Sequence, residues 1–127
     1  MTIKILLVDD HAVVRSGLSK FLMVNKDLKL VGEASDGNEA VQMVSLHKPD
    51  VVLMDLQMPE MTGVDALKQI RPEYPDLPIV ILTTFNDDAH VYAALRAGAS
   101  GFLLKEMSGD ELVALWNELH PEDPVSD

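Results

Sequence analysis

Acidic residues directly follow two of the most apolar segments of the chain. Asp9 and Asp10 come after the first of these segments, and Asp55 comes after the second. Carboxylates that gather at one place repel one another, so a bound cation or raised pKa values must compensate. Mg²⁺ suits such a group, because it takes oxygen ligands from one or two carboxylates together with water and phosphate oxygens. These acids therefore predict a magnesium site, provided that the fold brings them together.

A hydroxyl and a lysine follow two further apolar segments. Thr83 lies 28 residues after Asp55, and Lys105 lies 22 residues after Thr83. A divalent cation, a lysine and a hydroxyl facing a carboxylate are the groups needed to bind and transfer a phosphoryl group. Asp55 is the best candidate for the nucleophile, because a carboxylate can accept a phosphoryl group as an acyl phosphate. Lys105 would pair with the phosphoryl oxygens, and Thr83 would donate a hydrogen bond to one of them.

Five short apolar segments are predicted to form the strands that position these residues. They show little alternation, which is typical of strands in a sheet covered on both faces. The segment at 28–34 is the most polar and is predicted to lie at an edge of the sheet. The five segments are residues 3–8, 28–34, 51–54, 79–82 and 101–104.

Helical patterns follow each predicted strand. Asp36 and Glu39 form a predicted capping box that opens a helix reaching about His47. Pro72 and Gly98 are predicted to end the third and fourth helices. Five strand–helix repeats predict an α/β fold, a flavodoxin-like doubly wound parallel sheet with strand order 2-1-3-4-5. Ligands of such sheets bind beyond the carboxyl ends of the strands. The acidic residues, the hydroxyl and the lysine described above would converge there, namely Asp9, Asp10, Asp55, Thr83 and Lys105.

Composition and charge exclude several classes of protein. The chain has 127 residues, of which 10 are Lys or Arg and 21 are Asp or Glu, so its net charge is −11. This length indicates a single domain, since domains have about 100–200 residues. The acidic balance argues against direct contact with nucleic acid or an anionic membrane surface. The absence of cysteine excludes disulfides and thiolate sites. With no predicted signal peptide or membrane span, the expected location is the cytoplasm.

Four sequence runs together resemble a response-regulator receiver domain of bacterial two-component signalling, a CheY-like domain. The runs are ILLVDDH, VVLMDLQMPEMTG, ILTTF and AGASGFLLK, and the resemblance covers about residues 3–119. The runs DDHAVVRSGL and LTTF are similar to those of the NarL/FixJ subgroup. The predicted receiver domain is residues 1–120, and residues 121–127 form an acidic, proline-containing tail or the start of a linker.

The resemblance implies a role for each acidic residue. Asp55 matches the phosphoacceptor, and Asp9 and Asp10 match the acidic pair that places Mg²⁺, with Asp10 as the direct ligand. The backbone carbonyl of Gln57 matches the third protein ligand. Such a domain is a regulatory phosphoacceptor rather than an enzyme. Its implied partners are a sensor histidine kinase and, on phosphorylation, a second copy of the chain.

The resemblance also implies the residues of a switch. Thr83 matches the switch hydroxyl, Lys105 the phosphate-pairing lysine, and Phe102 the aromatic residue that changes rotamer on activation. Many receivers have proline after the lysine, whereas this chain has Glu106. A cis peptide bond at that place stays open, because a non-proline cis bond costs about 2.5–4 kcal/mol.

The resemblance implies a receiver that controls transcription through a DNA-binding domain absent from this chain, and three alternatives compete with it. NarL/FixJ proteins usually continue into a helix-turn-helix domain, and this chain does not contain one, so a stand-alone receiver that controls a protein partner is an alternative. A Mg²⁺-dependent phosphatase of the haloacid dehalogenase type would need an acid two residues after Asp55, where this chain has Gln57. A flavodoxin would need a phosphate-binding loop after the first strand, where Asp9 and Asp10 would repel phosphate.

Overall fold

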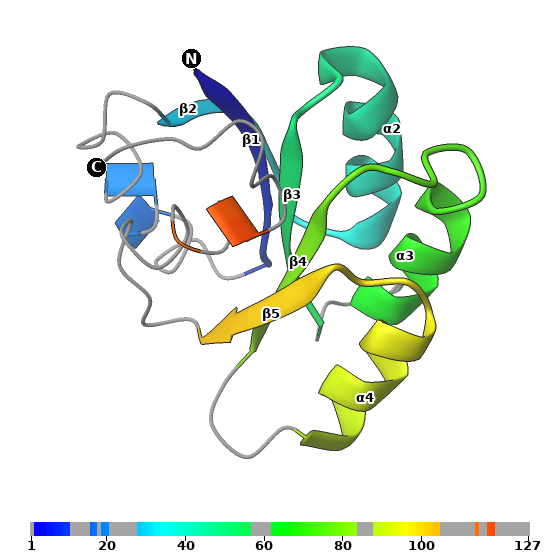
Figure 1. Ribbon diagram of the computed structural model, residues 1–127. Coiled ribbons are helices and arrows are strands. Elements are labelled where there is room, and N and C mark those ends of the chain that lie inside the picture. The colour runs from blue at the N-terminus through cyan, green and yellow to red at the C-terminus, as the bar shows by residue number, and fades with distance from the viewer. Residues whose placement is uncertain are drawn as a thin grey trace.

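The computed structural model describes residues 2–10, 16–17, 19–20, 28–56, 62–83, 88–104, 114 and 117–118. Its five strands form one parallel sheet in the order β2-β1-β3-β4-β5 (Figure 1). This arrangement confirms the predicted fold class and strand order. The elements are β1 (Ile3–Val8), β2 (Leu28–Ala34), α2 (Gly37–His47), β3 (Val51–Asp55), α3 (Gly63–Ile70), β4 (Ile79–Thr83), α4 (Asp88–Arg96) and β5 (Gly101–Leu104).

The three central strands are buried on both faces, as their apolar sequences predict. Every residue of β3 and β4 is buried, and in β1 only Lys4 is partly exposed. Strand β2 stands first in the strand order, which confirms its predicted edge position, and five of its seven residues are half-buried or exposed. Strands β3 and β4 each run one residue further than predicted, because Asp55 pairs with Leu82 and Thr83 pairs with Leu104. The polar end of each strand is thus still part of the sheet.

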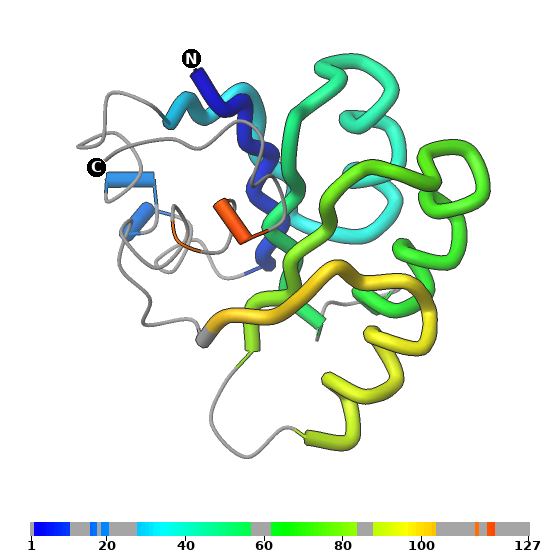
Figure 2. Tube along the Cα trace, viewed as in Figure 1, coloured from blue at the N-terminus to red at the C-terminus, as the bar shows by residue number. Residues whose placement is uncertain are grey.

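Two apolar layers cover the faces of the sheet. Helices α2, α3 and α4 pack on one face, where helix residues such as Leu67 and Ile70 belong to one buried apolar cluster with sheet residues such as Leu6 and Ile81. The other face holds the second layer of the core, formed in part by Ile5 and Leu53. Short helical pieces at 16–17, 19–20, 114 and 117–118 lie on that side (Figures 1 and 2). None of the described helices is long and apolar enough to cross a membrane.

Helix α2 begins as predicted, with one difference in its cap. The Asp36 carboxylate accepts a hydrogen bond of 2.9 Å from the Glu39 N–H, as an N-cap should. The Glu39 carboxylate, however, accepts from the N–H and the hydroxyl of Ser35, one residue before the position that a capping box predicts. Most of the chain that follows the first and fifth strands, where two further helices are predicted, and residues 121–127 lie outside the described residues.

Candidate metal centre

The ends of β1 and β3 place three acidic residues at one edge of the sheet. Asp9 and Asp10 follow the last residue of β1, and Asp55 is the last residue of β3, the strand beside it. The Asp9 N–H donates a 3.0 Å hydrogen bond to the Ala34 carbonyl, which continues the alignment of β1 with β2 by one residue. Backbone pairing therefore fixes where these side chains begin.

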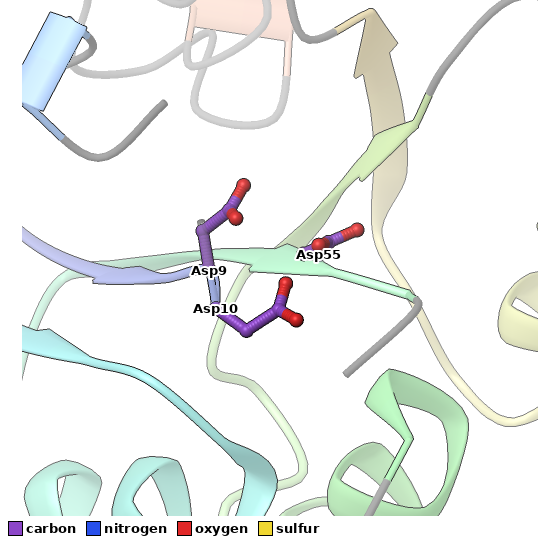
Figure 3. A group of neighbouring side chains, drawn as sticks. All are labelled: Asp9, Asp10 and Asp55. Atoms are coloured by element: carbon purple, nitrogen blue, oxygen red, sulfur yellow. The ribbon is translucent and has the colours of Figure 1, made fainter. Parts of the chain in front are cut away.

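The three carboxylates lie close together. One carboxylate oxygen from each of Asp9, Asp10 and Asp55 lies within 4.8 Å of the other two. Figure 3 shows that the Asp9 and Asp10 side chains leave the end of β1, whereas the Asp55 side chain leaves the end of β3. Asp9 is fully buried and Asp55 is 3% exposed, while Asp10 is half-buried. The predicted convergence of these three acids is confirmed.

This set of donors fits a hard divalent cation. All three residues offer carboxylate oxygens, which are the ligands that Mg²⁺ prefers over softer metals. Opposite ligands of Mg²⁺ are about 4.2 Å apart when each metal–oxygen bond is about 2.1 Å. The three oxygens lie within 4.8 Å of one another, so they are close enough together to surround one such cation. Burial strengthens the mutual repulsion of such anions, and a cation relieves it.

Thr83 ends the next strand at the same edge. It is the last residue of β4 and is 4% exposed. Asp55 pairs with Leu82, so the register places Thr83 one residue beyond the partner of Asp55. The structure thus brings four of the predicted residues to the carboxyl ends of three adjacent strands. Lys105 and Gln57, as well as the peptide bond before Glu106, lie outside the described residues.

Close packing of α3 against the strand end helps to shape the centre. The Gly63 N–H donates a 2.9 Å hydrogen bond to the Leu56 carbonyl. A Cβ atom added to Gly63 would lie 2.5 Å from the Asp55 carbonyl oxygen and 2.9 Å from the Leu56 Cα. Only glycine permits this approach. Thr62 caps α3, because its hydroxyl oxygen accepts a hydrogen bond from the Asp65 N–H, a contact that was not predicted from the sequence.

Phe102 lies away from the acidic cluster on β5, where it pairs with Ile81 of β4. Its side chain is 50% exposed. It lines a cavity of about 200 Å³ between β5 and α4, together with Asp88, Val91, Tyr92 and Leu95. In this structure the ring therefore faces outward, and the space beside it is bounded by α4, the helix that follows Thr83 in the chain.

The fold and the acidic centre are those of a receiver, and comparison with known proteins agrees. The family model of the response regulator receiver domain matches residues 5–117. The chain therefore belongs to the response regulator receiver domain family, and the predicted resemblance is confirmed. Domains of this family are phosphoacceptors rather than enzymes, in agreement with the prediction. The haloacid dehalogenase and flavodoxin alternatives are thereby displaced.

Similar proteins include regulators of the NarL and LuxR type. The chain is 47% identical over 110 residues to the uncharacterized transcriptional regulatory protein YhcZ of Bacillus subtilis, covering 87% of this chain and 51% of that protein. It is 44% identical over 112 residues to the response regulator protein VraR of Staphylococcus aureus, covering 88% and 54%. The receiver domain of the putative response regulator NarL of Mycobacterium tuberculosis superposes with a TM-score of 0.82 at 33% identity, covering 93% and 96%. The chain spans about half the length of the curated relatives it matches.

Proposed function

We propose that this domain accepts a phosphoryl group on Asp55 from a histidine kinase, with Mg²⁺ bound at the acidic cluster. The single observation that carries the proposal is the gathering of Asp9, Asp10 and Asp55 at the ends of β1 and β3. Asp10, Asp55 and the Gln57 carbonyl would hold the cation, and Asp9 would act through water. Mg²⁺ bound there would reduce the electrostatic repulsion between the Asp55 carboxylate and the incoming phosphoryl group, both of which are anionic.

The proposed transfer uses one carboxylate oxygen of Asp55. This oxygen forms a bond to phosphorus while the bond from phosphorus to the donor's imidazole nitrogen breaks. The electron pair of that broken bond stays on the imidazole. The transfer therefore needs no oxidant or reductant. Lys105 would pair with the phosphoryl oxygens and Thr83 would donate its hydroxyl hydrogen to one of them. The near-complete burial of Asp55 supports this role, because low solvent access strengthens such contacts.

The proposed output is control of transcription. Relatives such as YhcZ are described as transcriptional regulatory proteins, and they are about twice as long as the part that this chain matches. A DNA-binding domain elsewhere in the full protein would supply the contact with DNA that this acidic chain disfavours. Control of a protein partner by the receiver alone is the competing output. Dimerisation of the phosphorylated receiver would suit either of these outputs.

Removal of the metal is expected to abolish the proposed phosphorylation. Treatment with acetyl phosphate, a small phosphoryl donor, should add one phosphoryl group in the presence of Mg²⁺ and none after chelation with EDTA. Intact-protein mass spectrometry measures the gain.

Asp10→Asn is expected to weaken Mg²⁺ binding by about tenfold or more, because it removes a charged ligand from the cluster. Titration followed by NMR gives the affinity.

Asp36→Asn is the matched control for Asp10→Asn. It makes the same change of charge on the same protein, but it lies at the start of α2, where asparagine caps a helix as well as aspartate does. Its Mg²⁺ affinity should equal that of the wild type. Equal affinity in Asp10→Asn and Asp36→Asn would show that Asp10 is not a ligand.

Thr83→Ala is expected to allow phosphorylation of Asp55 but to prevent the structural change that follows it. Asp55 should still be modified, but α4 and β5 should no longer respond, because the hydroxyl that would move toward the phosphoryl oxygens is absent. In the wild type that movement would vacate space for Phe102 to turn inward from its exposed position. Each of the two states needs contacts that the other lacks, and Thr83 would supply one of them.

Thr83→Ser keeps the hydroxyl and serves as the control. NMR shifts of α4 and β5, recorded with and without beryllofluoride as a phosphoryl mimic, should change in the wild type and in Thr83→Ser alike. They should stay nearly constant in Thr83→Ala. A full response of Thr83→Ala would remove Thr83 from the switch.

A further inference from the structure

Arg71 connects two loops at the end of the sheet opposite the acidic cluster. It caps the C-terminal end of α3, and its guanidinium donates hydrogen bonds to backbone carbonyls in both loops. Nη2 donates a 2.7 Å bond to Gly98, in the turn after α4. Nη1 donates to three carbonyls of the connection between α3 and β4, which are Tyr74 at 2.9 Å, Pro75 at 3.0 Å and Leu77 at 2.7 Å.

Gly98 is shaped to receive this side chain. Its φ of +109° lies in the region that favours glycine. A Cβ atom added there would lie 3.1 Å from both Cγ and Nε of Arg71. The stem of Arg71 therefore lies directly against the bare α-carbon of Gly98, and its guanidinium sits where the C-terminal ends of α3 and α4 carry partial negative charge.

The position of Arg71 has an electrostatic cost. Burial lowers the pKa of Arg71, and attraction by Asp76 offsets part of that effect. The Nε atom is buried, and within the described part of the chain it has no hydrogen-bond partner. Such desolvation is unfavourable, so the four carbonyl contacts must outweigh it. Arg71 is therefore stable at this position only while its guanidinium contacts the carbonyls of both loops.

A second contact joins the same two loops. The Ser100 N–H donates a 2.8 Å hydrogen bond to the Ile79 carbonyl, and the Ile79 N–H donates a 3.1 Å bond to the Ser100 hydroxyl. The starts of β4 and β5 are therefore held together just beyond Gly98. Hydrogen bonds thus fix the chain that leaves the C-terminal end of α4.

The first turn of α4 is less buried than the second half of the helix. Among the nine residues of α4, only Ala94 is buried, and it lies in the second half of the helix. The residues of the first turn, Asp88, Ala89 and His90, are all exposed. By contrast α3, with eight residues, has four that are buried. Within the described residues, the burial of α4 is therefore concentrated in its second half, which lies further along the chain from Thr83.

We propose that Arg71 is a positioning residue that fixes the C-terminal end of α4, so that α4 pivots about Gly98 when the receiver switches. The inference rests on the proposed function only for the pivoting; the fixing of the loop can be measured without any phosphoryl group. Arg71 touches none of the reacting groups. It acts through Gly98, which limits movement to the half of α4 nearer the acidic cluster.

Arg71→Gln tests the fixed end in the unmodified domain. Loss of the charged contacts should increase amide hydrogen exchange at Gly98 and Ala99 by about tenfold or more, because this turn then opens locally. Arg96→Gln is the matched control, since Arg96 is exposed in the last turn of the same helix and carries the same charge. Equal exchange in these two variants would overturn the proposal.

Beryllofluoride then tests the pivot. In the wild type, the shifts that it induces should fall in the first half of α4 and be absent at Gly98 and Ser100. In Arg71→Gln they should extend through both residues, while beryllofluoride binding itself is unchanged. The same pattern of shifts in Arg71→Gln and the wild type would overturn the pivot. A wild type that binds no beryllofluoride would instead refute the proposed function and leave the exchange result standing.

Arg71→Lys keeps the test decisive if Arg71→Gln does not fold. Lysine retains the charge, but its single ammonium group cannot reproduce a planar guanidinium that reaches both loops. Exchange at Gly98 should therefore lie between the wild type and Arg71→Gln, or above the wild type if only the lysine variant folds. Wild-type exchange in Arg71→Lys would show that charge alone holds the turn, which contradicts the proposed link.

Discussion

Substitution of Gly63 by alanine is expected to destabilise the domain by about 2–3 kcal/mol, because overpacking forces the backbone to shift. The added Cβ atom would lie 2.5 Å from the Asp55 carbonyl oxygen. The three nearest atoms, in Asp55 and Leu56, all belong to the backbone, so no side-chain rotation can relieve the clash. The start of α3 would have to move, which would lengthen the 2.9 Å hydrogen bond from Gly63 to Leu56. Urea denaturation measures the loss of stability.

Gly17→Ala is the matched control for this substitution. Gly17 is helical, and a Cβ atom added there would meet no heavy atom of the described residues within 4 Å, beyond its own helix and chain neighbours. Alanine at such a position should stabilise the helix by about 0.5–1 kcal/mol. The two variants should therefore shift the denaturation midpoint in opposite directions. A midpoint of Gly63→Ala at or above the wild type would contradict the described packing of α3.

Asp55→Asn is expected to abolish phosphorylation at the centre, reducing the rate by about a thousandfold or more. The asparagine amide has nearly the same size as the carboxylate but is not a nucleophile toward phosphorus. The fold should persist, since the backbone pairing of Asp55 with Leu82 does not depend on the side chain. Intact-protein mass after treatment with acetyl phosphate and Mg²⁺ checks the loss, and circular dichroism checks the fold.

Asp65→Asn provides the control for this variant. Asp65 lies exposed in the first turn of α3 and is not part of the acidic cluster. It should gain one phosphoryl group as readily as the wild type does. If Asp55→Asn gains the group as fast as Asp65→Asn, the acceptor is another residue and the proposed role of Asp55 is wrong.

The sequence predicts the sheet well, because local pattern and burial agree. The strands at 3–8, 28–34 and 101–104 have the predicted bounds. The third and fourth strands are each one residue longer than predicted, since Asp55 and Thr83 are polar yet paired within the sheet. The convergence of Asp9, Asp10 and Asp55 was also predictable, because parallel strands end at the same edge.

The role of Arg71 could not be predicted from the sequence. An arginine just after a helix has the pattern of an ordinary solvated residue. Its four acceptors are backbone carbonyls, which carry no signal in the amino-acid types, and Gly98 is 27 residues away. Similarly, the shift of the Glu39 contact from Asp36 to Ser35 depends on side-chain conformation at the turn before α2. Such contacts follow only from the assembled fold.

Chemical trapping can locate the phosphoryl group itself and so tests whether Asp55 is the acceptor. Borohydride reduces an aspartyl phosphate to homoserine and releases phosphate, so the modified residue carries a permanent mass change. The domain is treated with acetyl phosphate and Mg²⁺, reduced, digested and analysed by peptide mass spectrometry. Homoserine is expected at position 55 and at no other aspartate. Homoserine at Asp9, Asp10 or another acid, or a phosphorylated domain that yields no homoserine, would contradict this expectation.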